Sequence, residues 1–162
     1  MTDFKGLLRT LSEPGIEFIL VGGVAAVAHG SARLTQDVDI VYRRTKDNIA
    51  KLATALADKT PYLRGAPPGL PFRWDQESIR RGLNFTLTTD LGDLDLLGEI
   101  TGGGGYEELL PHSVVIRAFG IECRCLDLPH LIHVKRAAGR PRDLEAIAEL
   151  EAILHEKTGD QE

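Results

Sequence analysis

The sequence has few of the features that would place the chain in a membrane or send it through a secretory pathway. Its 162 residues include two cysteines, one methionine and one tryptophan. The longest apolar stretch is far too short to span a bilayer. The opening residues, MTDFKGLLRTLSEPG, lack the basic start and apolar core of a signal peptide. We therefore expect a cytoplasmic protein with no membrane segment.

An excess of basic residues is also missing. Lysine and arginine total 19 against 24 aspartate and glutamate residues, which gives a formal net charge of −5. This balance argues against strong nonspecific RNA binding, although a local basic groove remains compatible with it. A hydrophobic share of 43% and a charged share of 27% are ordinary for a globular protein. The length predicts a single domain over residues 1–157 and a disordered tail over 158–162.

The two cysteines alternate in a predicted strand, at Cys123 and Cys125. A structural zinc site would need further ligands nearby, and the sequence has no second cysteine pair. We interpret both as reduced thiols on one strand face.

The chain is organised around one strand–helix–strand unit. It consists of an apolar strand, a glycine pair, a small-residue helix, a polar crossing and a second strand: Phe18–Val21, Gly22-Gly23, Val24–His29, Ser31–Gln36 and Asp37–Tyr42. Amide groups at a helix N-terminus attract anions, and glycine lets the backbone approach a phosphate with positive φ. By itself, however, a glycine pair is more typical of an ordinary tight turn.

The second strand of this unit carries Asp37 and Asp39. Side chains alternate along a strand, so both carboxylates point to the same face. Two close carboxylates repel each other unless a cation lies between them, and Mg²⁺ prefers carboxylate and phosphate oxygens. A solvated edge strand explains the Asp-x-Asp pattern alone equally well. The glycines and the aspartates together, within one short unit, favour a phosphate–metal site.

The pattern of Gly22-Gly23 followed by Asp37-x-Asp39 resembles the nucleotidyltransferase superfamily with the DNA polymerase β-like fold. The intervening His29-Gly30 and Arg33-x-Thr35, and the later run 131–144 (LIHVKRAAGRPRDL), are similar to small bacterial nucleotidyltransferases related to abortive-infection toxins. The resemblance covers most of the chain. It implies an α/β (α+β) fold, in which a small mixed β-sheet is flanked by helices.

The same resemblance implies a third acidic residue on a later strand. Asp95, in the middle of the predicted strand 93–97, matches that position. Asp93 lies two residues earlier on the same face and is the competing candidate, and Glu99 is a weaker third option. With Asp37 and Asp39, the third carboxylate would bind metal and take part in catalysis.

The resemblance further implies a set of nucleotide-binding residues: Gly22, Gly23, Arg33, Thr35, Lys135, Arg140 and Asp143. Several have simpler interpretations, which stay open. Arg33 is equally typical of an exposed arginine, and Thr35 either orients the Asp37 carboxylate or belongs to a turn. The basic cluster from Lys135 to Arg142 is also typical of a helix end, where cations are favoured.

The implied activity is metal-dependent transfer of a nucleoside monophosphate from an NTP to an unidentified acceptor, with release of pyrophosphate. The acceptor would be RNA or tRNA, a protein or a small molecule, and two Mg²⁺ or Mn²⁺ ions would assist. Two alternatives remain: a toxin restrained by an antitoxin partner, and a nucleotide-binding module without catalysis.

The remaining elements follow from periodicity and capping signals. Helices are expected at Phe4–Ser12, Thr45–Lys59, Asp75–Arg81, Tyr106–Leu110, Leu128–Ala138 and from Pro141 to about Lys157. Strands are expected at Asn84–Thr89, Asp93–Leu97, Ser113–Phe119 and Ile121–Leu126. We expect Gly102–Gly105 to be a mobile connector. The last helix is expected to bury Leu144, Ile147, Leu150, Ile153 and Leu154.

Overall fold

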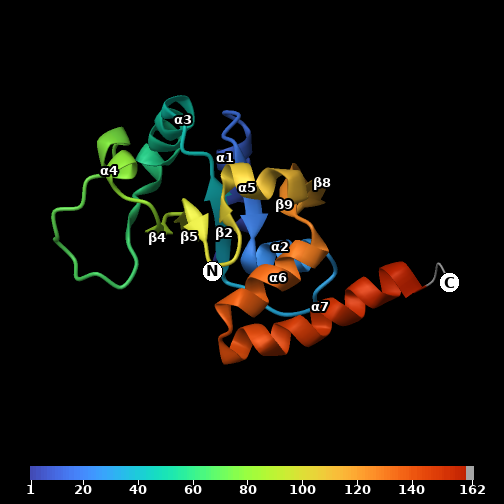
Figure 1. Ribbon diagram of the computed structural model, residues 1–162. Coiled ribbons are helices and arrows are strands. Elements are labelled where there is room, and N and C mark those ends of the chain that lie inside the picture. The colour runs from blue at the N-terminus through green and yellow to red at the C-terminus, as the bar shows by residue number, and fades with distance from the viewer. Residues whose placement is uncertain (160–162) are drawn as a thin grey trace.

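The computed structural model describes residues 1–159 and contains a mixed, seven-stranded β-sheet with helices on both faces (Figure 1). The sheet order is β3-β4-β5-β2-β1-β9-β8. In chain order these strands are β1 (Phe18–Val21), β2 (Asp37–Tyr42), β3 (Tyr62–Leu63), β4 (Phe85–Thr89), β5 (Gly92–Leu97), β8 (Ser113–Ala118) and β9 (Ile121–Leu126). A separate ladder pairs β6 (Glu99–Ile100) with β7 (Gly104–Gly105). The predicted fold class is confirmed.

The helices fall close to their expected positions. The α-helices are α1 (Phe4–Ser12), α2 (Gly22–Ala28), α3 (Lys46–Leu56), α4 (Gln76–Arg81), α5 (Tyr106–Leu109), α6 (Leu128–Ala138) and α7 (Pro141–Gly159), and two 3₁₀ turns are η1 (Ala57–Lys59) and η2 (Leu110–His112). Thr45, Asp75 and Asp127 cap α3, α4 and α6, because each side chain accepts a hydrogen bond from the backbone N–H three residues on.

The centre of the sheet forms the core. All four residues of β1 are buried, because this strand lies between β2 and β9 and helices cover it. Helix α1 packs against β5, β9 and α3, whereas α2 packs on β1 and β2 and contacts α6, which in turn packs on α7. Figure 1 shows α7 extending away from the sheet at its C-terminal end. The apolar run of β1 thus anchors the turn that follows it.

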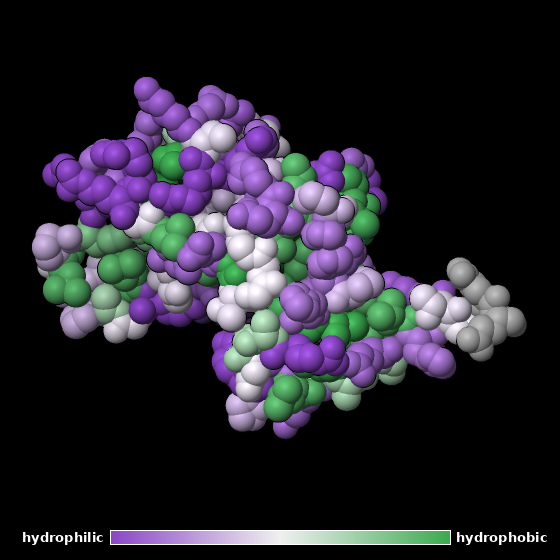
Figure 2. All heavy atoms as spheres, in the orientation of Figure 1, coloured by the Kyte–Doolittle hydropathy of each residue, from purple (hydrophilic) through white to green (hydrophobic). Residues whose placement is uncertain are grey.

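The surface is mixed. Figure 2 shows hydrophilic residues over the upper part of this face, around α3 and α4, and hydrophobic residues along α7. Within residues 1–159, no helix has both the length and the apolar character needed to cross a membrane.

Two expectations about the second half of the chain are wrong. Gly102–Gly105 is not a mobile connector, since Gly104 and Gly105 pair with β6 in a tight hairpin. A Cβ atom on Gly102, whose φ is +79°, would lie 2.4 Å from the Cβ of Ala137. Glycine therefore lets the hairpin tip pack directly on α6.

The last helix also differs from expectation. Ile147 and Leu150 are buried as expected, and Ile153 and Leu154 are partly buried against the core. Leu144, however, is 55% exposed, and Asp143 and Ala146 complete the buried face. Helix α7 continues to Gly159, two residues beyond its expected end. The rest of the predicted tail, residues 160–162, lies outside the described residues.

Candidate functional site

The acidic residues converge because β2 and β5 are parallel neighbours. In the register of this pair Asp39 lies opposite Asp95, and Asp37 lies opposite Asp93. Alternation along each strand directs all four side chains to one face. Carboxylate oxygens of Asp37, Asp39 and Asp95 lie within 4.8 Å of one another. The structure thus brings together the three residues that the sequence predicted as metal ligands.

The negative charge of these carboxylates is only partly compensated, and two of their oxygens accept no hydrogen bond from the described residues. Burial and, after it, the neighbouring carboxylates of Asp95 and Asp37 together raise the pKa of Asp39 to about 7, against the lowering effect of Lys135. Asp39 Oδ1 and Asp95 Oδ1 are buried with no hydrogen-bond partner among the described residues. Such oxygens are suited to binding a cation.

Arg64, which follows β3, reaches into this cluster. Its guanidinium lies 2.8 Å from Asp95, 3.5 Å from Asp93 and 3.8 Å from Asp37. The 2.8 Å contact is an ion pair whose angles do not meet those of a hydrogen bond, so Asp95 Oδ1 remains without a donor. Nη2 of Arg64 instead donates to the carbonyl of Leu87 at 2.7 Å. Arg64 partly neutralises the carboxylates without satisfying them.

The position of Asp93 separates it from the other three aspartates. It faces Nε of Arg64 near the start of β5 and lies outside the close group formed by Asp37, Asp39 and Asp95. Glu99, the third option, lies on the separate strand β6 and is exposed. The geometry therefore favours Asp95 as the third carboxylate.

The glycine pair packs directly against the acidic strand. Helix α2 begins at Gly22, two residues earlier than expected, and Gly22 has a φ of +69°. A Cβ atom on Gly22 would lie 2.0 Å from Oδ2 of Asp39, and one on Gly23 would lie 2.5 Å from Oγ1 of Thr35. Glycine at position 22 lets the turn lie against the Asp39 carboxylate, and glycine at position 23 leaves room for the Thr35 side chain.

The polar crossing contributes Arg33 and Thr35 to the same region. Thr35 Oγ1 donates to the backbone carbonyl of Asp37 at 3.3 Å, so it does not orient the carboxylate as one expectation had it. Arg33 is exposed and lies 3.6 Å from Glu145 on α7. Both residues line a cavity beside Asp37.

Basic residues at the C-terminal end of α6 and directly after it, Lys135 and Arg140, also line the site. Burial lowers the pKa of Lys135, against the raising effects of Asp143 and Asp39. Arg140 Nε donates to Asp143 at 2.6 Å. Burial alone would raise the pKa of Asp143, but its hydrogen bonds and ion pair with Arg140 outweigh burial and hold the pKa below its usual value. Asp143 therefore fixes Arg140, and Lys135 lines the same cavities as Asp39.

Two cavities of about 450 and 460 Å³ meet at these residues. They share five lining residues: Gly22, Asp39, Lys135, Arg140 and Asp143. One cavity continues along polar groups of the crossing, including Arg33 and Thr35. The other is more apolar and continues past Leu97, Ile100 and Leu131. A polar pocket and a more apolar pocket thus open on the same carboxylate.

Two residues that contact the site, Arg64 and Glu149, were not predicted from the sequence. Arg64 lies in a Gly- and Pro-rich segment without periodicity, and only folding brings it to the carboxylates. Glu149 of α7 accepts hydrogen bonds from Ser31 Oγ at 2.5 Å and from the amide of Ala32 at 3.0 Å. The last helix therefore holds the crossing that carries Arg33 and Thr35.

Comparison with known proteins agrees with this architecture. No protein-family model and no curated protein matches the sequence. Among solved structures, a candidate nucleotidyltransferase of Thermotoga maritima is 12% identical over 90% of this chain and 88% of its own, with a TM-score of 0.56. The lincosamide antibiotic adenylyltransferase LnuA, solved with lincomycin bound, is 15% identical over 93% of this chain and 96% of its own, with a TM-score of 0.61. The chain has the nucleotidyltransferase fold, as the resemblance implied.

Proposed function

We propose that this protein is a metal-dependent nucleotidyltransferase that moves a nucleoside monophosphate from an NTP to an acceptor hydroxyl and releases pyrophosphate. One observation carries the proposal. The parallel pairing of β2 and β5 gathers Asp37, Asp39 and Asp95 against the Gly22-Gly23 turn, with two buried carboxylate oxygens that have no donor in the described chain.

The donor set fits Mg²⁺ or Mn²⁺. Three carboxylates supply hard oxygen ligands, and the buried Asp39 Oδ1 has no donor in the described chain. Asp95 Oδ1 lies 2.8 Å from the Arg64 guanidinium, which an ion bound there would have to displace. When bound, a pair of such ions would stabilise the attacking and leaving oxygens of an in-line displacement. Asp37, Asp39 and Asp95 are the residues that would hold them.

The polar cavity supports binding of the triphosphate. Gly22 and Gly23 form a wall that the phosphates can approach closely, because neither carries a side chain. Arg33 and Arg140 supply guanidinium groups for phosphate oxygens, and Lys135 supplies a point charge beside Asp39. Thr35 shapes the crossing through its hydrogen bond to the Asp37 carbonyl. Asp143 positions Arg140.

The reaction is a single displacement at phosphorus. The acceptor oxygen forms a bond to the α-phosphorus as the bond from that phosphorus to the oxygen bridging to the β-phosphate breaks. The bridging oxygen leaves with pyrophosphate, and the acceptor proton passes to a carboxylate, for which Asp95 is the candidate base. The chain contributes positioning and charge stabilisation.

The more apolar cavity supports a small organic acceptor. Its walls at Leu97, Ile100 and Leu131 suit a partly apolar molecule. Because Asp39 also lines this cavity, a hydroxyl of such a molecule would lie beside the carboxylates. LnuA, which is similar in fold, is named for adenylyl transfer to lincosamide antibiotics and was solved with lincomycin bound. The label-transfer experiment below distinguishes a small-molecule acceptor from a tRNA end or a protein.

The decisive experiment follows label transfer and pyrophosphate release with each of the four α-labelled NTPs. Mg²⁺ or Mn²⁺ is added, and the acceptors are a panel of hydroxyl-bearing antibiotics, total tRNA and a cell lysate. The Asp37→Asn/Asp39→Asn double variant is the negative control, and Asp47→Asn, an exposed change on α3, is the matched control. We expect transfer to one acceptor class in wild type and in Asp47→Asn, and none in the double variant.

Other outcomes define other functions. Undiminished transfer in the double variant would refute the proposed site. Metal-dependent NTP binding without pyrophosphate release would indicate a binding module. Growth arrest on expression, abolished by Asp39→Asn and relieved by a co-expressed partner, would indicate the toxin of a toxin–antitoxin pair that uses the same chemistry.

A further inference from the structure

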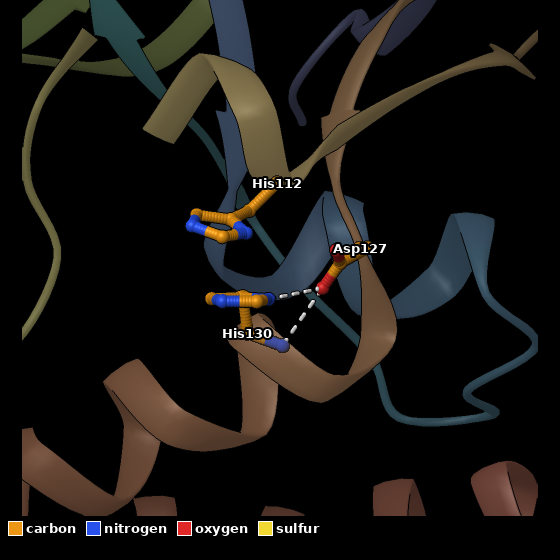
Figure 3. Close-up of side chains that lie close together, drawn as sticks. All are labelled: His112, Asp127 and His130. Carbon is orange, nitrogen blue, oxygen red and sulfur yellow. Dashed lines mark hydrogen bonds and ion pairs between the residues drawn. The ribbon is translucent and has the colours of Figure 1, made fainter. Parts of the chain in front are cut away.

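A second cluster of potential metal ligands lies away from the four aspartates. His112 ends η2, Asp127 is the residue between β9 and α6, and His130 lies in the first turn of α6. Figure 3 shows the two imidazole rings lying one above the other, with the Asp127 carboxylate at their side. The β8–β9 hairpin returns the chain to η2, which brings the three side chains together.

Part of this arrangement is helix capping. Asp127 Oδ1 accepts from the backbone N–H of His130 at 2.9 Å and from its Nδ1–H at 2.8 Å. An N-cap aspartate needs only the first of these bonds to satisfy the start of α6. Capping accounts for Asp127 and for its bond to the His130 amide, but not for the two imidazoles.

His112 has no role in the cap. Its ring stacks on that of His130 with centroids 3.6 Å apart and an interplanar angle of 19°. Within residues 1–159, neither ring nitrogen of His112 has a hydrogen-bond partner. A cavity of about 330 Å³ opens beside the stack, and Glu108 and His133 also line it. Two imidazoles and a carboxylate therefore meet at a half-buried position with access from solvent.

We propose that His112, Asp127 and His130 bind one divalent transition-metal ion, and that Zn²⁺ matches them best. Each residue offers a ligand atom, and these atoms lie within 4.8 Å of one another. Ligands about 2 Å from a tetrahedral ion are ~3.3 Å apart, so the ligand atoms have to approach one another by ~1.5 Å at most. Imidazole nitrogen suits Zn²⁺ and related ions, whereas Mg²⁺ prefers oxygen ligands. The open cavity leaves room for water as a fourth ligand.

Binding requires two local changes. The ion replaces the hydrogen-bonded proton between His130 Nδ1 and Asp127 Oδ1, and that proton passes to solvent. The His112 ring turns about its side-chain torsions until a nitrogen faces the ion, which ends the stacking. The bound ion then links η2 to the start of α6. This site is independent of the proposed nucleotidyl transfer.

Isothermal titration calorimetry with ZnCl₂ tests the proposal on the full chain. The Asp37→Asn/Asp39→Asn background removes competing binding at the carboxylates. In this background we expect one bound ion per chain, and at least about a hundred-fold weaker binding in His112→Ala and in His130→Ala. His155→Ala, an exposed change on α7, is the matched control and keeps the full affinity.

A spectroscopic readout reports ligand identity. Co²⁺ in the same site gives the visible absorption of a nitrogen- and oxygen-bound tetrahedral ion, which His112→Ala abolishes while far-UV circular dichroism stays unchanged. If His112→Ala fails to fold, His112→Gln serves in its place. Absence of one-to-one binding, or equal affinity in wild type and the His112 variant, would overturn the proposal. Loss of nucleotidyl transfer would leave it standing.

Discussion

The carboxylate edge of β2 and β5 and the histidine cluster beside α6 both gather three potential metal ligands, but their charge differs. At the first, Asp39 and Asp95 have buried oxygens without donors, and Arg64 supplies only partial compensation. At the second, Asp127 is already satisfied by His130. A cation therefore relieves repulsion at the carboxylates, whereas at the histidines it must displace an existing hydrogen bond.

This difference has a cause in the fold. Parallel strands place residues of equal register side by side, so Asp37 and Asp39 cannot avoid Asp93 and Asp95. The histidine cluster is instead assembled from a 3₁₀ turn and a helix start, whose cap already provides donors. Unsatisfied charge, more than ligand number, marks the carboxylate edge as the site with the stronger demand for a cation.

The largest expected effect is a loss of nucleotidyl-transfer rate that differs between substitution of Asp95 and substitution of Asp93. Asp95→Asn should lower the rate of nucleotidyl transfer by at least about 10³-fold, because it removes a carboxylate that would hold metal and accept the proton. Asp93→Asn should lower it by less than about 10-fold, since Asp93 contacts Arg64 but lies outside the close group. Steady-state pyrophosphate release measures both rates. Equal losses in the two variants would contradict the assignment.

Removal of Arg64 should destabilise the metal-free protein. Arg64→Met leaves three partly buried carboxylates without their shared cation, so the free energy of unfolding in EDTA should fall by about 2 kcal/mol. Chemical denaturation measures this change. Arg81→Met, at an exposed ion pair with Glu77, should change it by less than about 0.5 kcal/mol. Added Mg²⁺ should restore more stability to the Arg64 variant than to wild type.

The third expected effect is a pH dependence. In EDTA the folded protein keeps the Asp39 proton up to about pH 7, whereas the unfolded chain releases it near 3.8. The free energy of unfolding should therefore fall as pH rises from about 4 to 7, because the folded state binds more protons over that range. Asp39→Asn should remove about 1–3 kcal/mol of this fall. Parallel slopes for wild type and variant would contradict the raised pKa.

The smallest expected effect lies at the histidine cluster. Asp127→Ala removes the cap of α6 and should lower the free energy of unfolding in EDTA by about 1 kcal/mol. At a temperature where the variant is folded, its rate of nucleotidyl transfer should stay within about two-fold of the wild-type rate, which corresponds to a change of ~0.4 kcal/mol in the activation barrier. We expect no larger effect because Asp127 has no role in the proposed transfer site. Denaturation and pyrophosphate-release assays measure the two quantities. A large loss of transfer would mean that the two clusters are coupled.

Much of the fold could be predicted from local signals. The bounds of α1, β1, β2, β9 and α6 match their expected ranges, because apolar periodicity and capping residues such as Asp127 mark them directly. The glycine run 102–105 was misassigned because composition alone does not reveal that Gly102 packs on Ala137. Leu144 was misassigned because helical spacing does not fix which part of α7 faces the protein.

The candidate site could be predicted only where its residues lie in one short unit or in a family pattern. Gly22, Gly23, Asp37 and Asp39 lie close in sequence, so their shared geometry follows from strand alternation. Arg64 could not be found in this way, because its contact with Asp95 depends on the placement of a loop without periodicity. The roles of Lys135 and Asp143 in nucleotide binding remain predictions.

The irregular segment between β3 and α4 lies, along the sequence, between Asp37 and Asp39 on one side and Asp95 on the other. It contains Leu70, which is 49% exposed, and Figure 1 shows it looping out from the sheet. Chain cleavage is best tolerated in exposed loops of this kind. A cut there would leave Asp39 on one fragment and Asp95 on the other, although the two strands remain neighbours in the sheet. Neither fragment alone would hold the metal-binding set. If each fragment were fused to one of two other proteins, recovered activity would report that those two proteins associate.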